Sequence, residues 1–558
     1  MFPTKKYRMD SGQQIKESME WLWKVSKGYR TRILCVGAMG VARVTISLTF
    51  IWVCKRIIDN VTGEADGGLN GLMAAMIGLM LSRMLLSLAS ERISRKAEAG
   101  LTNRIRLDIF THLMTSRWSG KEERHSGDIL NRVIDDVPDV AAMICGGIPS
   151  TMVTVFQLSG ALYLLSMMDA RLALALLLIT PTALLLSKSY LRKIRRLTQE
   201  IRSAESSVQE HFQESVQNNL LLRSLEFTPN SVTKLRNLQT TLLGKVMGYT
   251  DFALFSRAMV QFGFTAGYIT AFLWGIFGLK SGAVTFGTMT AFLQLAAQIQ
   301  NPIVQLSRQV PAFARVLTSA GRLSELTSAP GEEPESPVAQ EGLSGIRIEG
   351  LGFAYSENEK RIFSDLSYDF APGSLTAVIG KTGIGKTTLM RLLLALVSPC
   401  DGKIVFYNNE GKEYPASPST RRNLSYVPQG NTLFSGTVRD NLLMGKPDAT
   451  EDELIDALHT AAADFVTELP DGLDTKCGEK GLGFSEGQAQ RIAIARGLLR
   501  PGGILLLDEP SSSLDIETEK ILIQRLKEKA KGKTLILVTH REEIASICTS
   551  VLRIDTPA

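Results

Sequence analysis

Cysteine and histidine are scarce in this sequence, and the cysteines that occur lie far apart. The six cysteines show no C-x-x-C pair among 558 residues. Their scatter argues against a structural zinc site or a disulfide framework, and it fits a reducing cytosolic face. The first 18 residues are polar and charged, so we expect no cleavable signal peptide.

The excess of positive over negative charge is also small, because the formal net charge is only +6 for 558 residues. The basic residues crowd between apolar runs, as at 188–196, instead of forming one stripe with aromatic side chains. This distribution argues against a nucleic-acid partner and favours a role in membrane orientation. We find no internal repeat, and no low-complexity tract beyond one linker.

Long apolar runs are abundant in the first part of the chain. A membrane span needs about 20 apolar residues. Six runs occur, at 33–54, 69–89, 143–168, 172–186, 252–279 and 286–306. The fourth is short and contains Pro181, which would kink a helix, so it must borrow flanking residues. One such run could be a buried core helix, but six in series predict an all-α transmembrane domain of six helices over residues 31–326.

The loops between these runs alternate in length and charge. Three are short, whereas residues 90–140 and 188–251 are long, helical in pattern and rich in Arg and Lys. The positive-inside rule places the two long loops and both termini in the cytosol. We expect both long loops to extend the spans as helices beyond the bilayer, each returning after a short turn.

Two segments flank the predicted transmembrane domain. Residues 11–29 combine helical spacing of apolar residues with Trp and Lys, so residues 1–30 are predicted to form a helix at the membrane interface. An ordinary amphipathic surface helix is the alternative. Residues 327–345 are rich in Pro, Glu and Ser and are predicted to be a linker. A soluble α/β domain is expected over residues 346–558.

A phosphate-binding loop organises this soluble domain. Residues 375–379 form an apolar run typical of a buried strand, and Gly380-x4-Gly385-Lys386-Thr387 has the spacing of a P-loop that opens a helix. Glycine lets the backbone approach a phosphate, and the helix N-terminus points its N–H groups at the anion. Lys386 would face the β- and γ-phosphates, and the Thr387 hydroxyl suits Mg²⁺. A chance glycine turn would not explain the strand–loop–helix context.

A second predicted strand, residues 504–508, ends in two carboxylates. Asp508 would hold Mg²⁺, directly or through water. Glu509 would act as the general base for an attacking water. An acidic turn after a strand would be the simpler explanation if no P-loop preceded it.

From these residues on, the chain resembles the ATP-binding cassette (ABC) family over residues 346–554, with every motif in family order. Phe484-Ser-Glu-Gly-Gln488 matches the signature motif and Ser512-Ser-Leu-Asp515 the D-loop. In the family an aromatic stacks on adenine, a glutamine senses Mg²⁺, and a switch histidine contacts the γ-phosphate. The resemblance therefore implies that ATP is bound by Tyr355, Gly380, Lys381, Thr382, Gly383, Ile384, Gly385, Lys386, Thr387, Thr388, Gln429, Ser485, Gly487, Gln488, Asp515 and His540. It implies catalysis by Glu509, His540, Lys386 and Gln429, and Mg²⁺ ligation by Thr387, Gln429 and Asp508.

One residue departs from the family signature, in which the third position is glycine. Here that position is Glu486. A carboxylate pointing at a triphosphate would be repulsive, whereas one pointing outward on the first helical turn would favour the helix dipole. We expect the outward orientation. An asymmetric ATPase that depends on its partner stays open as an alternative.

Six spans followed by one cassette resemble half of an ABC exporter. In that family Lys386 and Glu509 would need Ser485 of another chain, which implies a homodimer or a dimer with a homologous half-transporter. The resemblance also implies coupling helices near residues 117–125 and 218–223, and an X-loop at residues 478–481. It implies a cell membrane location, such as a bacterial inner membrane, with the cassette in the cytoplasm. The expected activity is ATP-driven efflux of an amphipathic small molecule, lipid or peptide; a gated channel or an importer has less support.

Polar residues within the apolar runs bear on the substrate. Arg43, Arg83 and Arg257 interrupt spans, where an unpaired charge costs about 2.5–3.5 kcal/mol. They could attract an anionic amphiphile into a cavity, although helix pairing or snorkelling is the favoured explanation. A further set could line a cavity or bridge helices: Gln157, Gln261, Gln294, Gln298 and Asn301.

Overall fold

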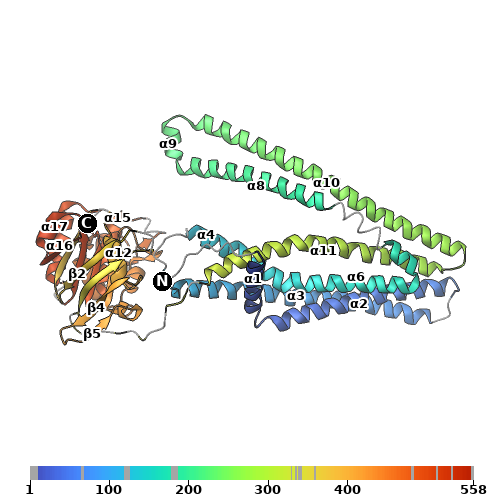
Figure 1. Cartoon of the computed structure of the whole chain (residues 1–558), viewed down its shortest axis with the longest axis horizontal. Coiled ribbons are helices and arrows are strands. Elements are labelled where there is room, and N and C mark those ends of the chain that lie inside the picture. Colours follow the sequence, from blue (N-terminus) through green and yellow to red (C-terminus); the bar gives the residue numbers. More distant parts are fainter. Residues whose placement is uncertain are drawn as a thin grey trace. The chain divides into compact units, whose positions relative to one another are not determined.

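The structure is a computed structural model (Figure 1). It describes residues 11–64, 68–118, 126–176, 187–328, 330–332, 336, 338, 342, 344–356, 360–381, 383–478, 483–510, 513–529 and 532–554. Contacts divide the chain into two compact units. One unit comprises Met1–Phe110 and Ser126–Thr327, and the other comprises Thr111–His125 and Ser328–Ala558.

Helices joined by short turns form the described part of the first unit (Figure 1). Its helices are α1 (Ser11–Val25), α2 (Arg30–Val61), α3 (Leu69–Thr115), α4 (Ser126–Asn131), α5 (Val137–Ala142), α6 (Ile148–Met168), α8 (Ser187–Gln217), α9 (Asn219–Ser224), α10 (Thr228–Lys280) and α11 (Phe286–Leu326). Two π-helical segments, Arg132–Asp136 and Met143–Gly147, join α4, α5 and α6 into one continuous helix. The predicted helix at 11–29 ends earlier than expected, at Val25, since Gly28 takes a left-handed φ of 94°.

Four helices are long and apolar enough to cross a membrane: Arg30–Val61, Leu69–Thr115, Gly127–Met168 and Thr228–Lys280. They contain the first, second, third and fifth apolar runs. Residues 177–186 of the fourth run lie outside the described residues. The sixth run forms most of the membrane part of α11, in which amide side chains interrupt the apolar ones. The predicted helical extensions are confirmed, because α3 continues to Thr115 and α9 joins the long α8 and α10.

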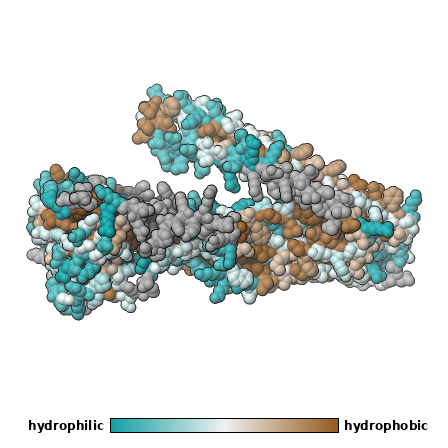
Figure 2. Space-filling view, viewed as in Figure 1, coloured by the Kyte–Doolittle hydropathy of each residue, from teal (hydrophilic) through white to brown (hydrophobic). Residues whose placement is uncertain are grey.

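The apolar surface of this unit matches a lipid environment. Figure 2 shows hydrophobic side chains spread over the helical unit. Along the apolar run of α3, residues 69–89, the exposed members are Met73, Ile77, Met80, Leu81, Met84, Leu85 and Leu88. Side chains of this kind are stable on a surface when hydrocarbon covers them. The interior is formed instead by α2, α6 and α11, where Phe292, Leu295 and Ile299 are fully buried.

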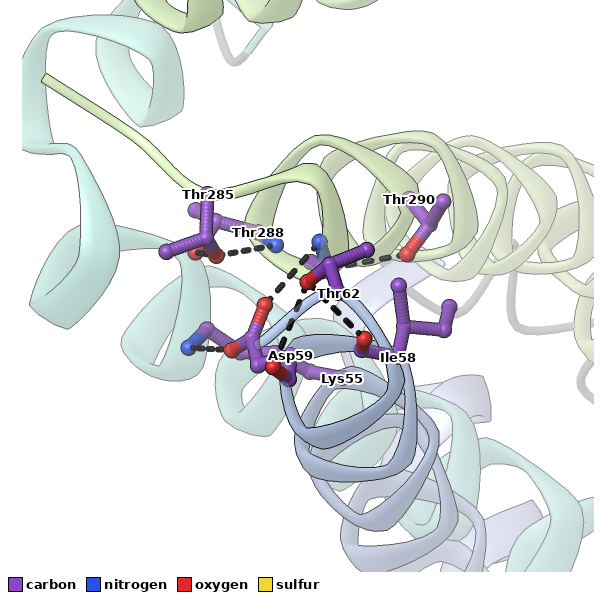
Figure 3. Close-up of polar contacts among 8 residues, drawn as sticks. Lys55, Ile58, Asp59, Thr62, Thr285, Thr288 and Thr290 are labelled. Atoms are coloured by element: carbon purple, nitrogen blue, oxygen red, sulfur yellow. Dashed lines mark hydrogen bonds and ion pairs between the residues drawn. The ribbon is translucent and has the colours of Figure 1, made fainter. Parts of the chain in front are cut away.

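A buried carboxylate joins α2 to the start of α11 (Figure 3). Asp59 is 3% exposed, and its Oδ2 lies 2.8 Å from Lys55 Nζ. Its Oδ1 accepts a hydrogen bond of 3.1 Å from the Gly287 backbone N–H, in the first turn of α11. Thr285 caps the same helix by accepting from Thr288 N. A negative charge at a helix N-terminus is stabilising, so Asp59 anchors the two helices where the short loops lie.

The second unit is built on three sheets. Its strands are β1 (Ser344–Phe353), β2 (Phe363–Phe370), β3 (Leu375–Ile379), β4 (Asp401–Asn408), β5 (Glu413–Pro415), β6 (Leu424–Val427), β7 (Gly436–Thr437), β8 (Lys476–Cys477), β9 (Ile504–Asp508), β10 (Thr534–Thr539) and β11 (Ser550–Arg553). Its helices are α12 (Lys386–Leu393), α13 (Val438–Leu443), α14 (Glu451–Thr460), α15 (Glu486–Leu499), α16 (Ile516–Lys529) and α17 (Glu542–Ile547). Short 3₁₀ segments occur at Pro418–Asn423, Asp464–Glu468 and Gly472–Asp474.

The central sheet is parallel, in the order β11-β3-β10-β9-β6, and the antiparallel sheet has the order β2-β1-β4-β5. Strands β3, β9 and β10 are buried along their whole length, as their continuous apolar runs predict. The register pairs Thr539 with Ile379, Val538 with Asp508, and Val427 with Leu507. The next residues of all four strands therefore leave the sheet at one edge.

The linker is attached to the cassette at several points. Arg421 makes a bidentate ion pair with Glu332, with both N–O distances at 2.7 Å. The Glu332 N–H donates to Thr115 O at 2.8 Å, and Ser116 forms an isolated β-bridge with Gly331. Further along, the Val338 N–H donates to Ser419 O at 3.1 Å. Thr115 and Ser116 belong to the second unit, so these bonds tie the linker to two other parts of the same unit, residues 115–116 and the 3₁₀ segment at Pro418–Asn423.

Candidate nucleotide-binding site

The P-loop connects β3 to α12 as the sequence predicts. Gly383 and Gly385 have φ of 83° and 113°, a left-handed conformation that glycine adopts without strain. Lys386 is 7% exposed, and its Nζ donates to Gly380 O at 2.7 Å. The ammonium is thus held inside the loop, at the N-terminus of α12. Ile384 is half-buried, Lys381 and Thr387 are exposed, and Thr382 lies outside the described residues.

Three predicted catalytic side chains meet at the carboxyl edge of the parallel sheet. Gln429 Nε2 donates to Glu509 Oε2 at 2.9 Å, and His540 Nδ1 lies 3.6 Å from Glu509 Oε1. Glu509 has a φ of 47°, which is rare for a residue with a side chain. Two bonds hold it there: its N–H donates to Val538 O at 3.0 Å, and its carbonyl accepts from Gln490 Nε2 at 2.8 Å. This conformation turns the carboxylate away from the strand.

Asp508 differs from Glu509 in its surroundings. It is 5% exposed, and the Tyr426 hydroxyl donates to its Oδ2 at 3.4 Å. Burial, and then the neighbouring charge of Glu509, raise the pKa of Asp508 above its usual value. A buried carboxylate that needs a positive partner suits a hard divalent cation, so Asp508 and the Thr387 hydroxyl fit Mg²⁺.

Tyr355 follows β1 and lies beside α12. Its hydroxyl bonds to the Thr388 hydroxyl at 3.1 Å and accepts from Arg391 Nη1 at 2.9 Å. The Arg391 guanidinium also stacks on the ring of Trp118, at 4.4 Å from the centroid. Tyr355, the P-loop helix and the segment after α3 are therefore joined through one arginine.

The signature residues form a separate cluster at the start of α15. Ser485 is the N-cap: its hydroxyl accepts from the Gln488 N–H at 3.2 Å, and its own N–H donates to Gln488 Oε1 at 2.9 Å. Gly487 is buried so closely that an added Cβ would lie 2.5 Å from Ser513 O. Within the described residues, no hydrogen bond or ion pair joins Ser485, Gly487 or Gln488 to the P-loop.

Asp515 and Glu486 lie next to this cluster. Asp515 caps α16 by accepting from the Thr518 N–H at 2.9 Å, and this backbone bond lowers the pKa of Asp515. Glu486 is exposed in the first turn of α15, where the helix dipole favours a carboxylate. Residue 512 of the D-loop motif and residues 479–481 of the X-loop motif lie outside the described residues, as does most of the first expected coupling helix.

Sequence reasoning missed Tyr426, Arg391 and Gln490. Gln490 is fully buried and holds the backbone of Glu509, while its Oε1 has no partner among the described residues. The sequence offered one signal for Gln490: it is an amide side chain on an otherwise apolar helix face, two residues after the signature glutamine Gln488. Tyr426 and Arg391 gave no local signal, because each bonds to a residue far away in sequence: Tyr426 to Asp508, and Arg391 to Tyr355.

Two family profiles match the chain. The profile of the ABC transporter transmembrane region matches residues 33–303, and the ABC transporter profile matches residues 363–512. The chain belongs to the ABC transporter family. It is an ABC exporter with its own ATPase domain, and it is a multi-pass membrane protein. The resemblance read from the sequence motifs and the predicted fold class are thereby confirmed.

Relatives cover nearly the full length of this ABC exporter. YgaD of Bacillus subtilis, a protein named for multidrug export with ATP-binding and permease parts, is 26% identical over 526 residues, or 92% of this chain and 90% of YgaD. A similarly named Staphylococcus aureus protein (strain NCTC 8325) is 29% identical over 527 residues, covering 92% of this chain and 91% of that protein.

The fold is also that of a solved exporter. An ATP-bound structure of a bacterial Atm1-family ABC exporter aligns with a TM-score of 0.76 at 21% identity, covering 95% of this chain and 94% of that one.

The polar residues inside the membrane helices have different roles. Arg43 donates to Ser87 at 3.4 Å and so joins α2 to α3, which supports the helix-pairing explanation. Gln157 bonds to Gln298, which in turn donates to Ser47 at 3.2 Å, so these amides bridge helices. Gln261 and Asn301 instead line a cavity, together with residues that the sequence did not single out.

Proposed function

We propose that this chain exports an amphipathic or hydrophobic substrate across the cell membrane, driven by ATP hydrolysis in a dimer with two ATP sites. The observation that carries the proposal is the division of the nucleotide machinery within one cassette. Lys386, Asp508, Glu509 and His540 gather at one sheet edge, whereas Ser485 caps a helix start whose signature residues share no bond with the described residues of the P-loop. A second cassette would supply the missing signature residues.

The proposed chemistry uses the chain's own side chains. Lys386 and the backbone N–H groups of the P-loop bind the β- and γ-phosphates. Glu509, oriented by Gln429 and its own left-handed backbone, accepts a proton as water attacks the γ-phosphate in line. The bond to the β-phosphate breaks, and ADP leaves. Mg²⁺, when held by Asp508, Thr387 and Gln429, would neutralise the phosphate charge. ATP at the shared seam favours the closed cassettes, and hydrolysis releases them.

The dimer can be tested by complementation between two inactive variants. Lys386→Ala removes the phosphate ligand, and Ser485→Asp places a carboxylate against the partner's phosphate while Asp still caps the helix. Each variant alone should lack ATPase activity. A tandem-purified dimer of the two should recover about half of the wild-type rate per dimer, because one of its two sites is intact. No recovery would exclude sites shared between chains.

A second experiment tests the alternative of a heterodimer with asymmetric sites. Glu486 at the signature motif is the observation that favours this alternative. If the purified wild-type chain forms a stable dimer in lipid but hydrolyses ATP only after a homologous half-transporter is added, the heterodimer replaces the homodimer. If Glu509→Gln binds ATP and still releases phosphate at the normal rate, Glu509 is not the base.

A further inference from the structure

A cleft lies between α10 and α11 in the helical unit. Its volume is about 570 Å³, within the range typical of small-ligand sites. Helix α10 contributes Gln261, Phe264, Thr265 and Tyr268, and α11 contributes Gln300, Asn301, Val304, Gln305 and Arg308. Among the described residues that line the cleft, amide, hydroxyl and aromatic side chains lie beside one guanidinium, and none carries a carboxylate.

Two amides fix the walls of the cleft. Gln300 is 8% exposed, and its Nε2 donates to Phe264 O on α10 at 3.1 Å. Its amide can lie there because position 267 is glycine: an added Cβ would lie 2.6 Å from Gln300 Nε2. On the other side, Gln305 accepts from the Thr154 hydroxyl of α6 at 3.3 Å. The cleft is therefore held by bonds to its neighbours and is a built feature of the bundle.

The remaining polar side chains of the cleft are exposed. Within the part of the chain that the structure describes, Gln261, Thr265, Tyr268, Asn301 and Arg308 make no side-chain hydrogen bond or ion pair to another side chain. Polar groups at membrane depth are expensive without a partner and mark substrate pathways. These five groups line one space, so a single ligand in that space would contact several of them.

The depth of the cleft indicates how its ligand lies. Arg308 is about 33 Å along α11 from Phe286 at about 1.5 Å per residue, whereas Tyr268 is about 18 Å along α10 from Lys280. The hydrocarbon core is about 30 Å thick. Measured from the short loops, the cleft thus runs from the middle of the bilayer to its cytosolic interface, with the charge at the interface and the aromatic rings deeper.

We propose that this cleft binds the exported substrate and that the substrate is an amphiphile with an anionic head group, which Arg308 contacts. Phe264, Tyr268 and Val304 would cover its apolar body, and Asn301 would hydrogen-bond its polar linkage. This inference rests on the proposed export function. It assigns the anionic preference to Arg308, in place of the arginines that interrupt the apolar runs.

The test compares two lipids that differ in head-group charge. Oleoyl lysophosphatidylglycerol is anionic and oleoyl lysophosphatidylcholine is zwitterionic, and both carry the same chain. Each is titrated into phosphatidylcholine nanodiscs that hold the wild-type exporter, and ATPase stimulation is measured. Half-maximal stimulation should need about tenfold less of the anionic lipid, equivalent to about 1.4 kcal/mol. Equal concentrations for the two lipids, or no stimulation by either, would overturn the assignment.

Substitutions test whether Arg308 causes the preference for the anionic lipid. Arg308→Gln should abolish the ratio between the two lipids, and Arg308→Lys should keep most of it. Arg315→Gln, which removes the same charge two turns further along α11 and outside the cleft, should leave both the ratio and the basal ATPase unchanged. The ratio is measured within one variant, so a general loss of activity does not alter it. A ratio that survives Arg308→Gln would contradict the proposal.

A direct measurement on the wild-type protein does not depend on variant folding. Oleoyl lysophosphatidylglycerol with a diazirine in its chain should label residues of 261–268 and 300–308. Labelling elsewhere, or a cross-link showing that a second copy fills the cleft, would overturn the site. Failure of the exporter function itself has a different signature, namely lipid transport that persists in Lys386→Ala.

Discussion

The attachment of the linker to the cassette gives the sharpest quantitative prediction. Glu332 accepts two hydrogen bonds from Arg421, both at 2.7 Å, and the side chains are only 20% and 26% exposed. A Glu332→Gln substitution keeps the shape of the side chain and removes its charge. Arg421 keeps its bonds to Leu394 O and Ala395 O, at 2.7 and 2.8 Å, so it is not left without partners.

The magnitude follows from losing one of the two hydrogen bonds. The Gln amide has one acceptor oxygen, and its NH2 group only donates, so one N–H of Arg421 loses its partner at position 332. A hydrogen bond to a charged group contributes about 1.5–3 kcal/mol, so the pair loses about 2 kcal/mol, and partial exposure reduces this to about 1.4 kcal/mol. That free energy corresponds to an approximately tenfold larger population of detached linker.

Limited proteolysis measures this population. Cleavage within residues 330–345 should be about tenfold faster in Glu332→Gln, provided that the linker opens and closes faster than the protease cuts. Glu413→Gln is the matched control, because it breaks an exposed pair with Arg347 in which the side chains are 49% and 37% exposed. An exposed pair contributes about 0–1 kcal/mol. Equal effects of the two substitutions, or less than a threefold change in Glu332→Gln, would refute the reasoning.

Two further predictions concern helix packing and catalysis. Gly287→Ala should destabilise the helical unit by about 1–3 kcal/mol, read as a lower melting temperature, because the added Cβ would lie 2.3 Å from Asp59 Oδ1 (Figure 3); Gly71→Ala, with no atom within 4 Å, should not. Gln490→Leu should lower kcat for ATP about tenfold with little change in KM, because it frees the Glu509 carbonyl that this amide holds. An unchanged kcat would remove Gln490 from the positioning of the base.

The parts of the fold that could be predicted are those whose signal is local. The strands at 375–379 and 504–508 are predicted because each is a continuous apolar run that ends in a motif, and the structure confirms both. The start of α15 was also readable, since a serine with a glutamine three residues later forms a capping box. In a parallel sheet the carboxyl ends of the strands meet at one edge, so the residues that follow these strands lie at that edge.

What could not be predicted depends on partners distant in sequence. Arg421 and Glu332 are 89 residues apart, and no sequence pattern at either position predicts that they form an ion pair. Arg308 lies in a helix with ordinary spacing, so the arginines inside apolar runs attracted attention instead. Of these, Arg43 is used for packing against Ser87. A sequence shows that a charge is costly in a membrane segment, but only the packing shows which charge lacks a protein partner.

Helix α12 connects the observations on the cassette. Its N-terminus carries the P-loop and Lys386, and the carbonyls of the two residues that follow its end, Leu394 and Ala395, accept from Arg421, which holds the linker. On its flank, Arg391 bonds to Tyr355 and stacks on Trp118 of the segment after α3. A helix of eight residues is too short to bend, so it moves as one body. A displacement of the phosphate end therefore shifts the linker and the α3 segment together, and breaking either attachment alone should weaken the coupling of ATPase to transport without abolishing it.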